Sequence, residues 1–201
     1  MKAFVTCGPA SEPIDAVRVI TNRSSGELGS KLSETLAAAD IDVECFRGTS
    51  ADYPPPAVGK VHPFTTNADL WKLLDAATEP PDFIFHAAAL CDFGGSNSGK
   101  LESRSEEMVL RLKPLPKVLP KFRERFPNAK IVGWKFEVED ADTARAKAHR
   151  QLIECDSDLC VLNGPAISSI FEIFSREGGF IQAVRTKEKL CEFLRDWALK
   201  P

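Results

Sequence analysis

Residues 17–29, Val-Arg-Val-Ile-Thr-Asn-Arg-Ser-Ser-Gly-Glu-Leu-Gly, bring small polar side chains and glycines together where a polar loop passes into a helix. Asn22 and the serines that follow it can accept hydrogen bonds from the first amides of that helix. Gly26 and Gly29 allow another backbone or a ligand to come close. The unpaired amides and the dipole of a helix start attract anions. The stretch therefore indicates a phosphate site, and an ordinary capped helix is the alternative.

Other polar residues follow apolar segments that resemble strands. Asp92 ends one such segment and Asn163 ends another, whereas Lys100 follows the glycine- and serine-rich run 94–99, which we expect to form a loop. The carboxyl ends of parallel strands gather at one edge of a sheet, where such sheets bind their ligands. We therefore expect the first loop, Asp92 and Asn163 to converge around a nucleotide-sized cleft.

Alternating strands and helices must position these groups. Hydrophobic periodicity and Gly/Pro breakers predict strands over 2–6, 41–46, 82–92, 108–112, 130–136 and 158–163. The same signals predict helices over 27–39, 67–77, 117–126, 141–154 and 186–199, with Thr186 capping the last one. Residues 169–174 and 180–184 predict a closing hairpin. The pattern predicts one α/β domain over 1–201, a Rossmann-like three-layer sandwich with a mainly parallel central sheet and a C-terminal hairpin.

Composition excludes several classes of function. The chain is 43% hydrophobic and 27% charged with a formal net charge of -3, a balance that argues against a nucleic-acid or anionic-membrane partner. No apolar run reaches the ~18 residues of a membrane span and no signal-peptide profile is present, so we expect a cytoplasmic protein. The six cysteines are dispersed without a Cys-x-x-Cys pair, which argues against a zinc site.

Several short motifs together resemble one family, phosphopantothenoylcysteine synthetase, which is the synthetase half of the bacterial bifunctional coenzyme A biosynthesis flavoprotein. They occur in the family's order and span nearly the whole chain: Thr6-Cys-Gly, Glu12-Pro-Ile-Asp15, Val17-Arg18, Ile20-Thr-Asn22, Ser24-Ser-Gly26 with Gly29, Ala87-Ala-Ala-Leu-Cys-Asp92, Lys100 before a strand, Val132-Gly133 with Glu137, and Asp158 to Asn163. The flavin-binding decarboxylase half has no counterpart in the sequence, so no flavin is expected.

The resemblance implies a ligase of coenzyme A biosynthesis that uses a nucleoside triphosphate, CTP in most bacterial members, together with Mg²⁺. The carboxylate of 4′-phosphopantothenate would attack the α-phosphate and release pyrophosphate. The amine of L-cysteine would then take the acyl group and release CMP. Such a reaction depends mainly on positioning and on compensation of phosphate charge. Family members are typically homodimers, and the edges of the hairpin near 169–184 suit such pairing.

The resemblance also implies roles for individual residues. The catalytic residues would be Asn22, which holds the acyl-nucleotide intermediate, Arg18, which engages an anionic group, and Lys100. Substrate would contact Asn22, Arg18, Ala88, Ala89 and Asp92. Nucleotide and phosphates would contact Gly8, Ser24, Ser25, Gly26, Gly29, Asp92, Trp134, Lys135, Phe136 and Asn163. No protein ligand to the metal is assigned.

Three segments depart from the family pattern. Gly8-Pro-Ala10 replaces Gly-Gly-Thr, which removes a backbone donor and a hydroxyl from the phosphate side. Lys100 is followed by Leu-Glu-Ser in place of further lysines, and Gly133-Trp-Lys-Phe-Glu137 replaces Gly-Phe-Ala-Ala-Glu. Lys135 is therefore either a new phosphate contact or a strand-edge lysine whose ammonium reaches solvent. These departures leave the choice of nucleotide open.

Two other functions remain open from the sequence. A divergent paralogue could bind nucleotide without this ligase activity, or act on another carboxylate. A Rossmann-type oxidoreductase is disfavoured, because the first loop lacks Gly-x-Gly-x-x-Gly and about twenty residues separate the first strand from its helix.

Overall fold

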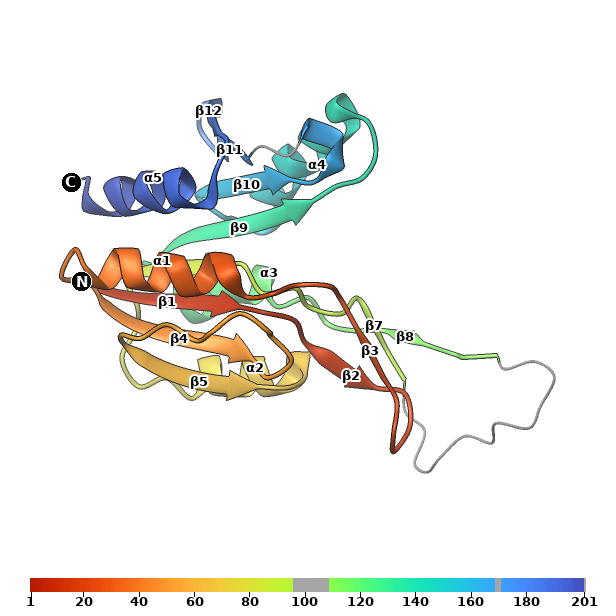
Figure 1. The fold of residues 1–201 in the computed structure, drawn as a ribbon. Helices are drawn as coiled ribbons and strands as arrows, with labels where there is room; N and C mark the ends of the chain where they lie inside the picture. The colour runs from red at the N-terminus through yellow and green to blue at the C-terminus, as the bar shows by residue number, and fades with distance from the viewer. Residues whose placement is uncertain (96–108, 169–170, 201) are drawn as a thin grey trace.

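A computed structural model describes residues 1–95, 109–168 and 171–200 (Figure 1). In this part of the chain, eight strands form one sheet, whose order is β12 (Gly179–Val184), β11 (Phe171–Ser175), β10 (Leu159–Asn163), β9 (Lys130–Phe136), β6 (Phe83–His86), β1 (Lys2–Cys7), β4 (Asp42–Gly48) and β5 (Lys60–Phe64). The strands from β5 to β10 pair in parallel, whereas β11 and β12 pair antiparallel at one end.

Helices cover both faces of this sheet. Helices α1 (Glu27–Ala37) and α5 (Lys187–Leu199) lie on one face and contact each other. Helices α2 (Asn67–Asp75), α3 (Leu119–Arg125) and α4 (Ala141–Glu154) lie on the other. The predicted α/β three-layer sandwich with a mainly parallel sheet and a C-terminal hairpin is confirmed.

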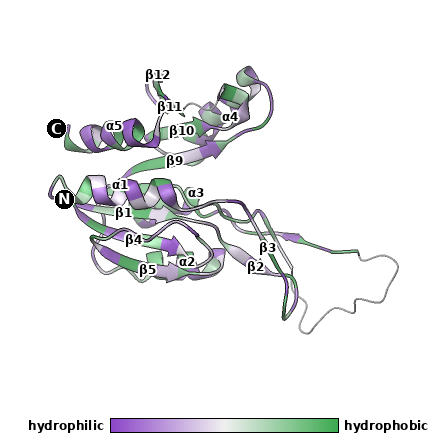
Figure 2. Ribbon diagram, viewed as in Figure 1, coloured by the Kyte–Doolittle hydropathy of each residue, from purple (hydrophilic) through white to green (hydrophobic). Residues whose placement is uncertain are grey.

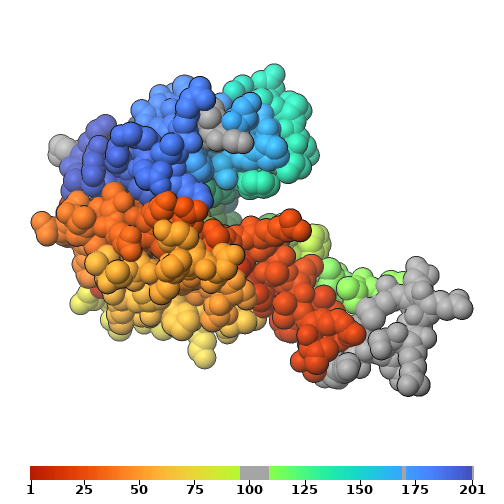
Figure 3. Space-filling model, in the orientation of Figure 1, coloured from red at the N-terminus to blue at the C-terminus, as the bar shows by residue number. Residues whose placement is uncertain are grey.

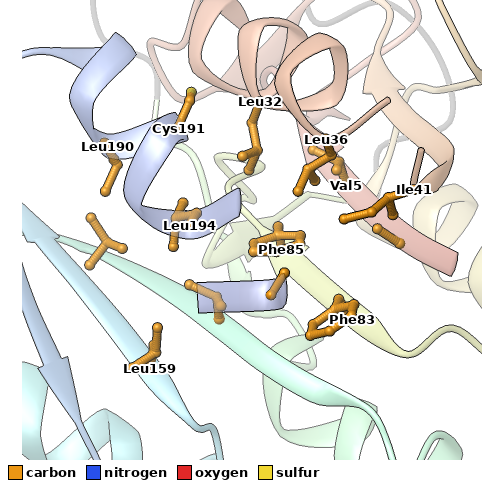
Figure 4. Packing of buried hydrophobic residues seen from close by; sticks show 14 of the residues in the cluster. Val5, Leu32, Leu36, Ile41, Phe83, Phe85, Leu159, Leu190, Cys191 and Leu194 are labelled. Carbon is orange, nitrogen blue, oxygen red and sulfur yellow. The ribbon is translucent and has the colours of Figure 1, made fainter. Parts of the chain in front are cut away.

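The alternation of side chains along the strands places buried hydrophobic clusters on both faces of the sheet. In β1, Val5 points toward α1 and α5, whereas Phe4 points toward α2 and α3, and both are fully buried. Figure 4 shows Leu32 of α1 and Leu194 of α5 packed over the sheet beside Phe85. Hydropathy along α1 follows this packing, since hydrophobic and hydrophilic residues alternate around the helix (Figure 2).

Two small hairpins extend from the carboxyl end of the sheet. The first pairs β2 (Ser11–Pro13) with β3 (Val19–Thr21), and the second pairs β7 (Phe93–Gly94) with β8 (Lys113–Pro114). The two hairpins contact each other and form an arm that projects from the body of the molecule (Figures 1 and 3).

Some predictions of secondary structure were wrong. The strand expected over 82–92 ends at His86, and residues 109–112 of the strand expected over 108–112 form none. Gly94, expected in a loop, belongs to β7. The short strands of the arm and β5 were missed, because three-residue strands and the mostly exposed edge segment Lys60–Phe64 carry little hydrophobic periodicity. None of the helices in the described ranges is long and apolar enough to cross a bilayer.

Candidate functional site

A pocket of about 690 Å³ opens at the carboxyl edge of the sheet, within the usual range for small-molecule sites. Its floor comes from Gly8 after β1, from residues 22–29 that lead into α1, and from Ala87, Ala88 and Ala89 after β6. Its wall comes from Trp134 and Phe136 of β9, Asn163 of β10, Phe171 of β11 and Lys187 of α5. The pocket therefore joins elements from both ends of the chain.

Glycine is required at two places on the pocket floor. Gly8 and Gly26 have φ values of 75° and 81°, a left-handed conformation that disfavours other residues. A Cβ on Gly8 would lie 2.8 Å from Cβ of Ala51, and one on Gly26 would lie 3.0 Å from the same atom. Close packing against Ala51 thus holds the two glycines side by side where α1 begins.

The start of α1 differs from an ordinary capped helix. Its N-cap residue is Gly26, which offers no side chain, and Ser25 Oγ accepts a hydrogen bond from the Glu27 amide at 3.2 Å. Asn22 does not cap the helix, because its Nδ2 donates to the carbonyl of Leu90 at 2.7 Å. That bond holds Asn22 beside the alanines that follow β6 and leaves its second N–H able to donate to a ligand.

Charged side chains line one side of the pocket. Lys187, at the start of α5, forms an ion pair with Glu27 in the first turn of α1. Glu27 also pairs with Lys31 at 2.8 Å, and the two ammonium groups, that of Lys187 above all, hold the pKa of Glu27 below its usual value. Arg23 is an exposed cation on the same floor. The structure thus identifies three charged pocket residues, Arg23, Glu27 and Lys187, that the sequence motifs did not indicate.

The aromatic wall follows from the alternation of β9. Trp134 and Phe136 face the pocket, whereas Lys135 lies on the opposite face and pairs with Glu137 at 3.1 Å. The indole Nε1 of Trp134 is buried and has no hydrogen-bond partner in the described part of the molecule. Side chains of this kind suit a planar ring such as a nucleobase.

The structure brings most predicted site residues together. The pocket is lined by Gly8, Asn22, Ser24, Ser25, Gly26, Gly29, Ala88, Ala89, Trp134, Phe136 and Asn163. Their roles stay predictions. Lys100 lies outside the described residues.

Three predicted residues do not line this pocket. Lys135 faces away from it, as described above. Arg18 lies in the turn between β2 and β3, where its guanidinium pairs with Asp15 and its amide donates to the same carboxylate at 2.8 Å. Asp92 precedes β7 in the arm, is exposed and pairs with Lys117. The shorter β6 explains the last case, since it ends at His86 and the chain has turned into the arm by Asp92.

Sequence reasoning missed seven pocket residues: Cys7, Arg23, Glu27, Leu28, Ala87, Phe171 and Lys187. The first five lie within or between the recognised motifs, so their neighbours could have indicated them. Phe171 and Lys187 lie outside every motif, and no local signal distinguishes them from a strand residue and a surface lysine.

The sequence of residues 1–190 matches the family described as DNA/pantothenate metabolism flavoprotein C-terminal domain. The chain is 30% identical over 166 residues to the Coenzyme A biosynthesis bifunctional protein CoaBC of Thermococcus kodakarensis, which covers 81% of this chain and 41% of that protein. It is 35% identical over 137 residues to the protein of the same name from Methanocaldococcus jannaschii, which covers 68% of this chain and 33% of that protein. The chain thus spans less than half the length of these two relatives.

The fold is also similar to that of a solved structure, the DNA/Pantothenate Metabolism Flavoprotein from Streptococcus pneumoniae. The two chains share 26% sequence identity with a TM-score of 0.85, and the alignment covers 98% of this chain and 97% of the other. The resemblance to the phosphopantothenoylcysteine synthetase family is thereby confirmed, and the chain belongs to the DNA/pantothenate metabolism flavoprotein C-terminal domain family.

Proposed function

We propose that this chain is a phosphopantothenate–cysteine ligase that works through an acyl-nucleotide intermediate. The observation that carries the proposal is that the start of α1, Asn22 and the Ala88–Ala89 backbone line one pocket with an aromatic wall. These parts suit the three pieces of such an intermediate, namely a phosphate, an acyl chain and a base. Membership of the family supports the same activity.

The first step joins the carboxylate of 4′-phosphopantothenate to the α-phosphorus of the nucleotide. A carboxylate oxygen forms a bond to phosphorus, the bridging bond to the β-phosphate breaks, and pyrophosphate leaves. The Leu28 and Gly29 amides in the first turn of α1 would bind phosphate oxygens, since first-turn amides have no partner within the helix and lie at the positive end of its dipole. Asn22 would donate its second N–H to the intermediate.

The second step transfers the acyl group to cysteine. The amine nitrogen bonds to the acyl carbon, the bond from that carbon to the phosphate oxygen breaks, and the nucleoside monophosphate leaves while the amine loses a proton. The pocket contributes mainly by holding both reactants at a fixed distance and orientation. CTP is the nucleotide we propose, with Trp134 and Phe136 against its base.

Mg²⁺ would enter with the nucleotide. The described residues contain no cluster of three or more His, Cys, Asp or Glu side chains suited to a metal, and the carboxylate among the described pocket residues, Glu27, is held by lysines. Mg²⁺ commonly binds through substrate phosphates and keeps several of its waters, so it does not need a cluster of protein ligands at this pocket. When bound, it would neutralise charge on the triphosphate.

The test uses the purified chain with 4′-phosphopantothenate, L-cysteine, Mg²⁺ and each nucleoside triphosphate in turn. We expect pyrophosphate release that requires phosphopantothenate, and a product mass equal to the amide of the two substrates, with CTP giving the highest rate. Absence of both signals with every triphosphate would contradict the proposal.

A second candidate function is nucleotide binding without ligation. It is favoured by Pro9, which lacks an amide N–H, and by Ala10, which lacks a hydroxyl, in the loop next to Gly8. Measured binding of a triphosphate without pyrophosphate release, at saturating concentrations of both co-substrates, would favour this candidate over the ligase.

A further inference from the structure

We propose that Lys187 is a phosphate-binding residue that exchanges its ion pair with Glu27 for a phosphate of the bound nucleotide. The inference rests on the proposed function and adds to it a residue from the last helix of the chain. It also gives Glu27 a role, which is to hold Lys187 at the pocket until a phosphate arrives.

The fold holds Lys187 at the pocket. The Thr186 side chain accepts a hydrogen bond from the Lys189 amide at 3.2 Å, which caps α5 so that Lys187 is its first residue. Contact between α1 and α5 brings this residue to the start of α1, 160 positions away in the sequence from Glu27. Two helix starts and a lysine ammonium therefore lie at one side of the pocket, and all three favour an anion.

The Lys187–Glu27 pair can separate without leaving Glu27 unpaired. Glu27 keeps its bond to Lys31 at 2.8 Å, and Lys31 also pairs with Glu188 at 2.6 Å. The Lys187 side chain is 37% exposed, and ion pairs this open to water contribute little to stability. A phosphate carries more charge and more acceptor oxygens than a carboxylate, so it is the stronger partner for an ammonium.

The charge balance of the pocket also favours exchange. Among the described residues that line it, the cations are Arg23 and Lys187, and Glu27 is the carboxylate. While Lys187 pairs with Glu27, the carboxylate compensates the charge of the ammonium, and among the described pocket residues Arg23 is the remaining cation. Once Lys187 turns to the ligand, its charge compensates a phosphate, and Lys31 continues to neutralise Glu27.

If this exchange occurs, substitutions of Lys187 and of Glu27 should change the affinity for a triphosphate in opposite directions. Lys187→Gln removes a charged donor, and we expect it to weaken binding of a triphosphate by about tenfold. Glu27→Gln removes the competitor for the lysine and a negative charge beside the phosphates, and we expect it to tighten binding by roughly two- to fivefold. An ion pair with a purely structural role would give effects of the same sign.

The experiment uses calorimetry to measure equilibrium binding to the purified chain with Mg²⁺, using CTP and, separately, inorganic tripolyphosphate. Tripolyphosphate carries no base, so it reports on the phosphate contacts alone. Lys189→Gln is the matched control, because Lys189 lies on the same helix, pairs with Glu192 and does not line the pocket. We expect wild-type affinity from this control, and melting temperatures verify that every variant is folded.

Each outcome decides for or against the inference. Unchanged binding of both probes by Lys187→Gln, while wild type binds CTP and turns over, would overturn the role of Lys187 and leave the proposed function standing. Unchanged or weaker binding by Glu27→Gln would overturn the exchange. If wild type bound neither probe, both the inference and the proposed function would be wrong.

Discussion

Asn22 is the residue whose type matters most to the proposed reaction. Its Nδ2 donates to the Leu90 carbonyl at 2.7 Å, so the amide is oriented by the chain that follows β6. A neutral amide can donate to a phosphate or to an acyl oxygen without adding charge. A carboxylate of the same size can do neither, and it would repel both the Leu90 carbonyl and the phosphates.

We predict that Asn22→Asp lowers kcat/KM for the ligase reaction by about 100-fold or more, the range seen when one donor to a developing charge is lost. The melting temperature should fall by only a few degrees, because Asn22 is exposed and loses one hydrogen bond. Steady-state pyrophosphate release and thermal unfolding together measure the two effects.

Asn128→Asp provides the matched control, since it makes the same chemical change in an exposed turn that does not line the pocket. We expect wild-type kinetics from it. Equal rates for Asn22→Asp and wild type would remove Asn22 from the site.

Helix α1 connects the pocket to the core, because its first turn lines the pocket while its inner side packs on β1. Gly29 makes this close approach possible. A Cβ at Gly29 would lie 2.2 Å from Cβ of Cys7, so the backbones of α1 and β1 would have to move apart to accommodate it. Any larger residue must therefore displace the start of α1, which also carries the proposed phosphate contacts.

We predict that Gly29→Ala lowers the free energy of unfolding by about 2 kcal/mol, since overpacking outweighs the better helix propensity of alanine. For a chain of this size, the melting temperature would fall by roughly 4–8 °C. The affinity for CTP should fall as well, and calorimetry measures it.

Gly178→Ala is the control for this prediction. The added methyl group would meet its nearest atom, Ser175 Oγ, at 3.4 Å, which is an ordinary contact. Its stability should remain within about 0.5 kcal/mol of wild type. A stable Gly29→Ala variant would show that α1 can shift over Cys7 without cost.

The stability of the whole molecule should depend on pH through one buried imidazole. His86 ends β6 at the centre of the sheet, where Nδ1 lies 2.7 Å from Thr6 Oγ1 and the ring packs edge-on against Phe122. Burial lowers the pKa of His86 from 6.5 to about 4, so the folded chain keeps this side chain neutral.

We predict that stability falls as the pH is lowered from 6.5 toward 4. In that window the unfolded chain binds a proton at His86 and the folded chain does not, so stability rises with pH. The loss between pH 7 and pH 5 should be about 2 kcal/mol. Denaturant unfolding measured at intervals of half a pH unit would show it.

His86→Gln is the matched variant, because it keeps a polar side chain beside Thr6 but cannot titrate. Its stability should change less than half as much as wild type between pH 6.5 and 5. Carboxylates such as Glu27 and Glu188, whose pKa values are lowered from 4.5, act mainly below this window. Parallel curves for the two proteins would rule out His86 as the cause.

The sequence by itself determined the fold class and the centre of the candidate site. Helix α4 was predicted with its observed bounds, and Thr186 caps α5 as predicted, because helix-favouring composition and capping are properties of neighbouring residues. The stretch that leads into α1 was recognised from residue types that suit a helix start. The residues of this stretch that line the pocket are adjacent in sequence, so their proximity needs no knowledge of the fold.

The tertiary structure alone decided which distant residues join that centre. Phe171 and Lys187 reach the pocket because β11 pairs beside β10 and α5 packs on α1, and neither arrangement can be read from local periodicity. The early end of β6 at His86 lets the chain turn, so that Asp92 lies in the arm and away from the pocket, although it shares one sequence motif with Ala88 and Ala89. Local sequence patterns specify helices and strands, whereas contacts between these elements depend on which of their faces are buried against each other. The Lys187–Glu27 pair joins two helices, so it could be identified only from the tertiary structure.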